Sequence, residues 1–263
     1  MLNQPHQGIY NLKTELNLPF LVLGSSLIVL WISVQIGGFV GRRLRPLRDD
    51  EREDFSVVLT ATLTLLALII GFTFSMAVSR YDQRKDYEEE ANAIGTEYAR
   101  ANLLPAADRA RIRTLLVQYL DQRLLFYTTR DPHELEQINL ESTKLQTTMW
   151  SIVQSAGLAQ PNAVVALVVS GMNDVLNRQG YTQAAWWNRI PPGAWILMLA
   201  LAICSSFLIG YGKRRLGTAL FSVFPVIVSV AFFLVADIDS PRRGLIRVRP
   251  QNLMSLADSL RAD

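Results

Sequence analysis

Glu88, Glu89 and Glu90 form the densest group of potentially reactive side chains in the sequence. Acid–base or nucleophilic catalysis requires a nucleophile beside a base, or metal ligands at a suitable spacing. The stretch from Glu88 to Asn92 has neither arrangement. Phosphate-binding loops, dinucleotide-binding glycine patterns and nucleophile elbows do not occur elsewhere in the chain. The sequence therefore predicts a protein that is not an enzyme and requires no cofactor.

The three glutamates have two other interpretations. Arg84 and Lys85 precede them by about one helical turn, so they could form ion pairs on the solvated face of a stalk. Alternatively, the three carboxylates could line a charged vestibule at the mouth of a pore.

Asp237 and Asp239 are the second group of acids that could bind a ligand, because carboxylate oxygens bind hard cations. Two acids are too few for a complete coordination shell, and Arg242 and Arg243 follow closely. Pairing with these arginines is therefore the structural alternative to a metal site. The two histidines and the single cysteine, Cys204, have no metal-ligand spacing.

The apolar residues are concentrated in blocks. Half of the 263 residues are hydrophobic although 19% are charged, which is typical of a membrane protein. A helix needs about 20 mostly apolar residues to cross a bilayer. Four segments meet that length, at residues 18–40, 57–78, 194–212 and 216–236. The predicted fold class is an all-α integral membrane protein with four transmembrane helices.

The remaining chain divides around these spans. We expect an N-terminal tail (1–17), a transmembrane hairpin (18–78), a helical extramembrane domain (79–189) that starts with a stalk (79–104), a second transmembrane hairpin (190–236) and a C-terminal tail (237–263). Within the domain, Pro105, Asp131-Pro132 and Pro161 are helix-start signals, and Gly157 and Gly180 are the expected ends of two helices. Tryptophans near the third span, namely Trp186, Trp187 and Trp195, are expected to be interfacial anchors.

Membrane orientation remains open at this stage. Arginines and lysines are frequent in both short hairpins, which favours a cytoplasmic location for them. Similar numbers of basic residues lie beside the other ends of the spans. In both orientations the domain and the two tails share one side, because the spans number four. The net charge of +3 gives no indication of a nucleic-acid partner.

The second span has a distinct face of small and polar residues. At 100° per residue, this face occupies roughly one third of the helix circumference. Its members are Ser56, Thr60, Thr64, Ala67, Gly71 and Ser75. Small residues let helix backbones approach in lipid, so the face could pack against a neighbouring helix. It could instead line a pore.

The second span is expected to continue as an unbroken helix into the stalk, because no turn signal follows Ser79. Apolar residues recur there at steps of four and three, which predicts a narrow packing seam. They are Tyr87, Ala91, Ile94, Tyr98 and Ala101. Gly95 in this seam costs about 1 kcal/mol of helix propensity, which close approach of another backbone would explain.

Two segments carry a family resemblance. The run GFTFSMAVSRYDQRKDYEEEANAIGTEYARANLLP, from Gly71 to Pro105, and the run DSPRRGLIRV, from Asp239 to Val248, resemble two signatures of the bestrophin-like domain family. Its members are uncharacterised, mostly bacterial, four-span membrane proteins, so the resemblance implies a multi-pass protein of the cell inner membrane.

A more distant resemblance is to bestrophins, which are pentameric anion channels. It implies self-association, inorganic anions as partners and a second span that lines the pore. An apolar constriction would then lie near Phe72, Phe74 and Met76, with Phe74 nearest the polar face. Arg80, Tyr81 and Arg84 occupy the place where an arginine-rich segment continues the pore helix. Animal bestrophins bind calcium near the position of Asp237 and Asp239.

Two functional hypotheses follow. The first is a homo-oligomeric ion channel in the lipid bilayer, with Thr60, Thr64, Gly71, Phe74 and Ser75 lining the pore. The second is a non-conducting membrane scaffold or sensor, whose helical domain binds a partner.

Overall fold

The computed structural model describes residues 18–43, 47–85, 87–212, 218–240, 242 and 244–262. These residues form helices joined by short connections and contain no strand, so the predicted all-α class is confirmed. In chain order the helices are α1 (Leu18–Arg43), α2 (Arg52–Gln83), α3 (Tyr87–Arg100), the 3-10 turn η1 (Ala101–Leu103), α4 (Ala106–Thr128), α5 (Pro132–Ala159), α6 (Ala163–Trp187), α7 (Pro192–Tyr211), α8 (Thr218–Asp239) and α9 (Gln251–Ala262).

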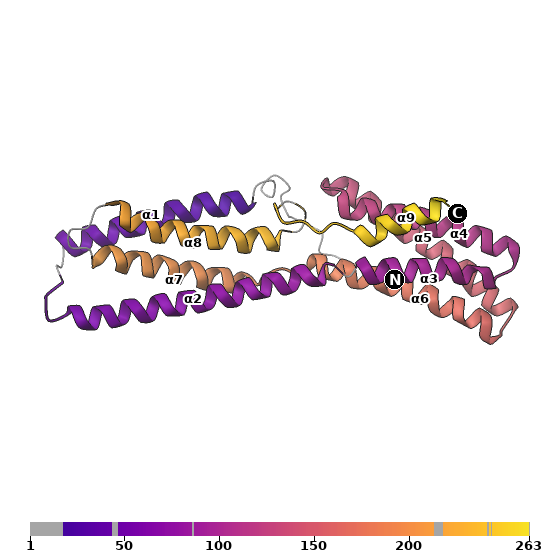
Figure 1. Cartoon of the computed structure of the whole chain (residues 1–263), viewed down its shortest axis with the longest axis horizontal. Helices are drawn as coiled ribbons and strands as arrows, with labels where there is room; N and C mark the ends of the chain where they lie inside the picture. Colours follow the sequence, from indigo (N-terminus) through magenta and orange to yellow (C-terminus); the bar gives the residue numbers. More distant parts are fainter. Residues whose placement is uncertain are drawn as a thin grey trace. The chain divides into compact units, whose positions relative to one another are not determined.

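The chain divides into two compact units (Figure 1). The membrane unit contains α1, most of α2, α7 and α8, and the helical unit contains α3, η1, α4, α5, α6 and α9. In the part of the chain that the structure describes, four helices are long and apolar enough to cross a membrane, and they correspond to α1, α2, α7 and α8. The four predicted spans are therefore present, with ends that differ from the predicted ones by at most five residues.

Close contact between α1 and α7 organises the membrane unit. A Cβ added at Gly41 would lie 2.5 Å from the carbonyl oxygen of Tyr211, and one at Gly210 would lie 2.8 Å from the carbonyl carbon of Val34. Gly37 meets the backbone of Phe207 in the same way. The two helix backbones thus touch at positions where only glycine fits, a common device between membrane helices. The sequence analysis did not identify this interface, although Gly37 and Gly41 are spaced one helical turn apart.

The helical unit has its own apolar core. Ile112, Leu116, Met149, Val168 and Met172 are among its fully buried side chains. Helix α5 starts as predicted, because Asp131 caps it by accepting a hydrogen bond from the His133 amide and Pro132 occupies the first turn.

The seam on α3 is buried in this unit, as its spacing predicted. Ala91, Ile94 and Ala101 are buried and Tyr98 is half-buried, whereas the side chain of Tyr87 lies outside the described residues. Gly95 is approached by the Leu256 side chain of α9, whose Cδ1 would lie 3.1 Å from an added Cβ. A side chain, not a backbone, therefore occupies the space beside this glycine.

The expected unbroken helix into the stalk is wrong. Helix α2 ends at Gln83, Arg84 and Lys85 form a turn, and α3 begins at Tyr87. The Arg84 side chain is buried and donates to the carbonyl oxygens of Ala185 and Asn188 at the end of α6. These contacts fix the chain in a turn at this point.

Two helix ends and one tryptophan also differ from expectation. Helix α5 runs past Gly157 to Ala159, and α6 runs past Gly180 to Trp187. Trp186 is a buried core residue that packs edge-on against Phe126 and Tyr127, so it is not an interfacial anchor. Arg45 and the basic residues 213–215 lie outside the described residues.

Candidate functional site

The small and polar face of α2 is exposed along its whole length. Ser56, Thr60, Thr64, Ala67, Gly71 and Ser75 are all exposed. The buried residues of α2, namely Leu66, Thr73 and Ala77, lie on a different face. Leu66 packs in the apolar cluster that contains Leu30 of α1 and Met198 of α7. Helix α2 therefore packs within the chain through another face and leaves its small and polar face uncovered.

The groups on this face are compatible with water or a helix neighbour. Apart from the neighbouring backbone of α2 itself, no atom of the described residues lies within 4 Å of a Cβ added at Gly71. Thr64 donates its hydroxyl hydrogen to the Thr60 carbonyl at 2.9 Å, and Ser56 donates to the Glu53 carbonyl at 2.8 Å. Further along α2, Phe72, Phe74 and Met76 are exposed too.

Beyond Ser79, the candidate vestibule residues have different surroundings. Arg80 is half-buried. The Tyr81 hydroxyl donates to the Arg247 carbonyl at 3.4 Å, and Arg84 donates to the Asn188 carbonyl at 3.1 Å. A cation at the C-terminal end of a helix stabilises the unpaired carbonyl groups there. Arg84 thus holds the end of α6.

The three neighbouring glutamates also separate. Glu88 is exposed, Glu89 pairs with Arg178 of α6, and Glu90 is fully buried. Their expected pairing with Arg84 and Lys85 is wrong, because Lys85 pairs with Asp82 and Arg84 with backbone carbonyls. The helix break at Arg84 removes the one-turn spacing on which that expectation depended.

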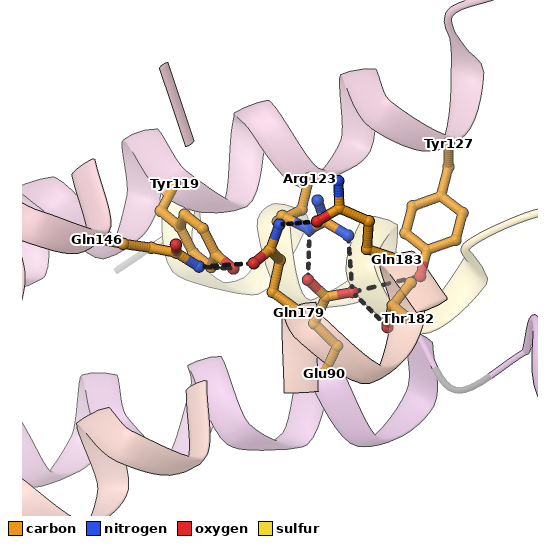
Figure 2. A network of polar contacts seen from close by, with 8 residues as sticks. All are labelled: Glu90, Tyr119, Arg123, Tyr127, Gln146, Gln179, Thr182 and Gln183. Carbon is orange, nitrogen blue, oxygen red and sulfur yellow. Dashed lines mark hydrogen bonds and ion pairs between the residues drawn. The ribbon is translucent and has the colours of Figure 1, made fainter. Parts of the chain in front are cut away.

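Glu90 is the centre of a buried polar network in the helical unit (Figure 2). Its carboxylate forms an ion pair with Arg123 and accepts hydrogen bonds from Tyr127 at 3.2 Å and Thr182 at 3.4 Å. The Arg123 guanidinium carbon also lies 4.4 Å from the Phe126 ring centre. Three helices, α3, α4 and α6, are linked through this one carboxylate.

The network continues through neutral groups. Gln146 donates to the Tyr119 hydroxyl and to Gln179, which in turn donates to Gln183 (Figure 2). Burial, followed by the charge of Glu90, raises the pKa of Tyr119 and Tyr127. Both phenols therefore stay neutral hydrogen-bonding groups at physiological pH.

The sequence analysis missed Arg123 although one signal was available. Arg123 continues the apolar face of α4 that contains Ile112, Leu116 and Tyr119. An arginine at a core position requires a buried acid nearby, but the spacing does not show which acid.

Asp237 and Asp239 bind backbone amides of the membrane unit. Asp237 accepts hydrogen bonds from the amides of Leu245 at 2.7 Å and Ile246 at 2.9 Å. Asp239 accepts one from the Ile190 amide at 3.3 Å. The carboxylates therefore fix the chain segments at the end of α8.

The described residues contain no group of three or more acidic, histidine or cysteine side chains that could hold a metal. Arg243, one of the two arginines expected to pair with Asp237 and Asp239, lies outside the described residues.

The fold and the exposed face on α2 define a class of protein: a multi-pass membrane protein with a helical insert between its second and third spans. The sequence profile of the Bestrophin-like domain matches residues 27–253. The chain therefore belongs to the bestrophin-like family.

Solved structures agree with this assignment at the level of the fold. A bacterial bestrophin homologue from Klebsiella pneumoniae, solved by zinc phasing, is similar over 92% of this chain and 96% of its own, with 16% identity and a TM-score of 0.63. A single-substitution variant of a Klebsiella pneumoniae homologue is similar over 92% of this chain and 97% of its own, with 14% identity and a TM-score of 0.65. No individually curated protein matches the chain.

Proposed function

We propose that the protein is a homo-oligomeric ion channel for inorganic anions, in which α2 lines a central pore. The observation that supports this proposal is the uncovered face of α2. Leu66, Thr73 and Ala77 are buried on one face, whereas the small and polar residues are exposed on another. If several copies were arranged around an axis, that second face would line a water-filled pore and would also contact neighbouring α2 helices.

The small and polar face of α2 must contact lipid, protein or water. Polar groups at membrane depth are tolerated where they face protein or a water-filled cavity. Thr60 and Ser75 are exposed, and the hydrogen bonds of the described residues include none from either hydroxyl. Water in a pore would supply those bonds. Membership of the bestrophin-like family supports the same arrangement, and a pentamer follows by analogy with bestrophins.

The first experiment is the stoichiometry of the detergent-purified protein, measured by native mass spectrometry. A ring of five copies supports the proposal, and a monomer overturns it. The second experiment is anion flux into proteoliposomes. Phe74→Ala should raise the flux because it widens the constriction, and Gly71→Leu should lower it about tenfold or more because it fills the pore face.

The matched control for these variants is Ile196→Ala. Ile196 is an exposed apolar residue of α7, so its truncation should leave the flux unchanged. Leu68 and Ile69 are unsuitable controls, because Leu68 borders the hollow that Thr60 and Thr64 line and Ile69 packs on the apolar cluster. Flux that is indifferent to both Phe74→Ala and Gly71→Leu contradicts the pore assignment.

A non-conducting scaffold or sensor is the second candidate. An apolar hollow at the turn between α5 and α6 supports it, because Trp150, Leu158 and Val169 line this hollow and Leu158 is exposed. A partner of the helical unit could bind there. A monomeric protein without flux would make this candidate the better proposal.

A further inference from the structure

A polar cleft lies beside the contact between α3 and α6 in the helical unit. It has a volume of about 430 Å³ and is lined by Glu89, Asn92, Thr96, Arg100, Asp174 and Arg178, together with Ala93 and Gly171. That volume falls in the lower part of the range of about 300–1,000 Å³ for small-molecule sites. Polar and charged side chains dominate the lining, so a ligand would have to be polar and small.

A buried carboxyl group lies beside this cleft. Glu97 of α3 is fully buried, and neither of its oxygens has a hydrogen-bond partner. A Cβ added at Gly171 would collide with Glu97 Oε2, and it would lie 2.5 Å from Arg100 Nη1. Both atoms thus lie against the backbone of Gly171, which itself lines the cleft.

The charged groups of the cleft are unevenly paired. Arg178 and Glu89 neutralise each other across the two helices. Arg100 makes one long hydrogen bond, at 3.4 Å, to the carbonyl oxygen of Leu167. Asp174 is exposed on α6 and, like Glu97, has no ion-pair partner among the described residues. Arg100 and Asp174 therefore line the cleft and are available to a ligand, whereas the carboxyl group of Glu97 is buried beside it.

Burying a carboxylate without a partner is costly, so such a group takes up a proton or acquires a partner. Burial raises the pKa of Glu97 to about 8, Arg100 opposes this rise and Asp174 adds to it. In the empty cleft at neutral pH, Glu97 is therefore mostly protonated.

We propose that the cleft binds a small zwitterion, with its carboxylate on Arg100 and its ammonium group on Asp174, beside the buried carboxyl group of Glu97. Arg100 can hold a carboxylate with two parallel hydrogen bonds. The ammonium group supplies the opposite charge that both acids lack. Binding ionises Glu97, and its proton is released to solvent because an adjacent cation favours the carboxylate form.

Calorimetric titration of the purified full-length protein tests this proposal, with glycine and β-alanine as probes. Acetate and methylamine, which carry only one of the two charges, are the reference compounds. We expect a zwitterion Kd on the order of 1 mM and binding at least tenfold tighter than either reference compound. Titrations at pH 7 in buffers of different ionisation enthalpy should show release of a proton on binding.

Variants assign the binding to this cleft. Asp174→Asn and Glu97→Gln should each weaken zwitterion binding at least tenfold, and Glu97→Gln should abolish the proton release. Asp174 is exposed, so its variant retains the fold even if the buried substitution does not. Glu136→Gln, at an exposed position of α5, is the matched control and should leave binding unchanged.

Three results would overturn the proposal: no binding of either zwitterion, equal binding of methylamine, or unchanged binding in Asp174→Asn. These measurements require no ion flux. A failure of the channel proposal and a failure of this one are therefore distinguishable.

Discussion

The membrane unit and the helical unit solve the same packing problem with different residues. In the membrane unit, the α1 and α7 backbones touch at Gly37, Gly41 and Gly210. Two of the buried hydroxyls there, those of Ser26 and Ser33, donate to carbonyls of their own helix four residues earlier. In the helical unit, long polar side chains cross between helices, as the Glu90–Arg123 pair does.

This difference follows from the surroundings in which each unit folds. In lipid, the hydrophobic effect does not drive helices together, because the lipid tails are as apolar as the side chains. Van der Waals contact between closely packed small residues provides the attraction instead. In water, burial of apolar side chains drives packing, and a few buried polar groups are affordable when they are fully paired. Each unit also contains groups that depart from its own rule. They include the uncovered polar face of α2 and the unpaired carboxyl group of Glu97.

The largest expected effect is at the paired carboxylate of the helical unit. Glu90→Ala leaves Arg123 buried without its ion-pair partner, which should lower the free energy of unfolding by about 3–5 kcal/mol. Chemical denaturation followed by tryptophan fluorescence measures this loss. Glu89→Ala, which removes an exposed pair, should cost about 1 kcal/mol or less.

A double variant separates charge from packing at the same position. Glu90→Leu combined with Arg123→Met replaces the buried pair by apolar groups, and it should be more stable than Glu90→Leu alone. Equal stabilities of the single and double variants would refute the view that the unpaired arginine causes the loss.

The second largest effect concerns Glu97 and depends on pH. Its pKa is raised from 4.5 to about 8, so between these values the native protein binds a proton that the unfolded chain has lost. The stabilising contribution is therefore complete below about pH 4.5 and is lost as the pH rises to about 8. Glu97→Gln does not titrate, so its stability relative to the native chain should increase over this interval, by on the order of a few kcal/mol.

Thermal unfolding of both proteins at a series of pH values measures this difference. Glu136→Gln is again the control, because Glu136 is exposed. A stability difference between Glu97→Gln and the native chain that does not change with pH would show that Glu97 is ionised in the folded protein.

The two units also differ in what their sequence reveals. The distribution of apolar residues along the sequence locates the four spans, because a helix needs about 20 mostly apolar residues in one segment to cross a bilayer. The α3 seam and the cap at Asp131 follow from local spacing. The partner of Glu90 is 33 residues away on another helix, so no local pattern identifies it. The turn at Arg84 likewise depends on carbonyl groups about 100 residues later in the chain.

A third prediction tests the glycine contacts of the membrane unit. Gly210→Ala forces a methyl group against the backbone of Val34 and Gly38, which should cost about 1–3 kcal/mol of stability. Thermal unfolding in detergent measures the loss. Gly24→Ala is the control on α1, since nothing lies within 4 Å of its added Cβ. Equal stability of the two variants would show that the backbones of α1 and α7 do not approach each other closely at Gly210.

The smallest effect on stability is expected at Gly71, where the membrane unit departs from its own rule. No atom of another helix in the described part of the chain would meet a methyl group there, and alanine is favoured over glycine inside a helix by about 1 kcal/mol. Gly71→Ala should therefore unfold at the same temperature as the native chain or slightly above it. Any change in stoichiometry or anion flux must then come from contacts outside the chain, either with a second copy or with water in a pore. A variant that retains its stability but changes its flux supports the pore-facing assignment of α2, whereas a variant that loses stability would mean that this face packs within the chain.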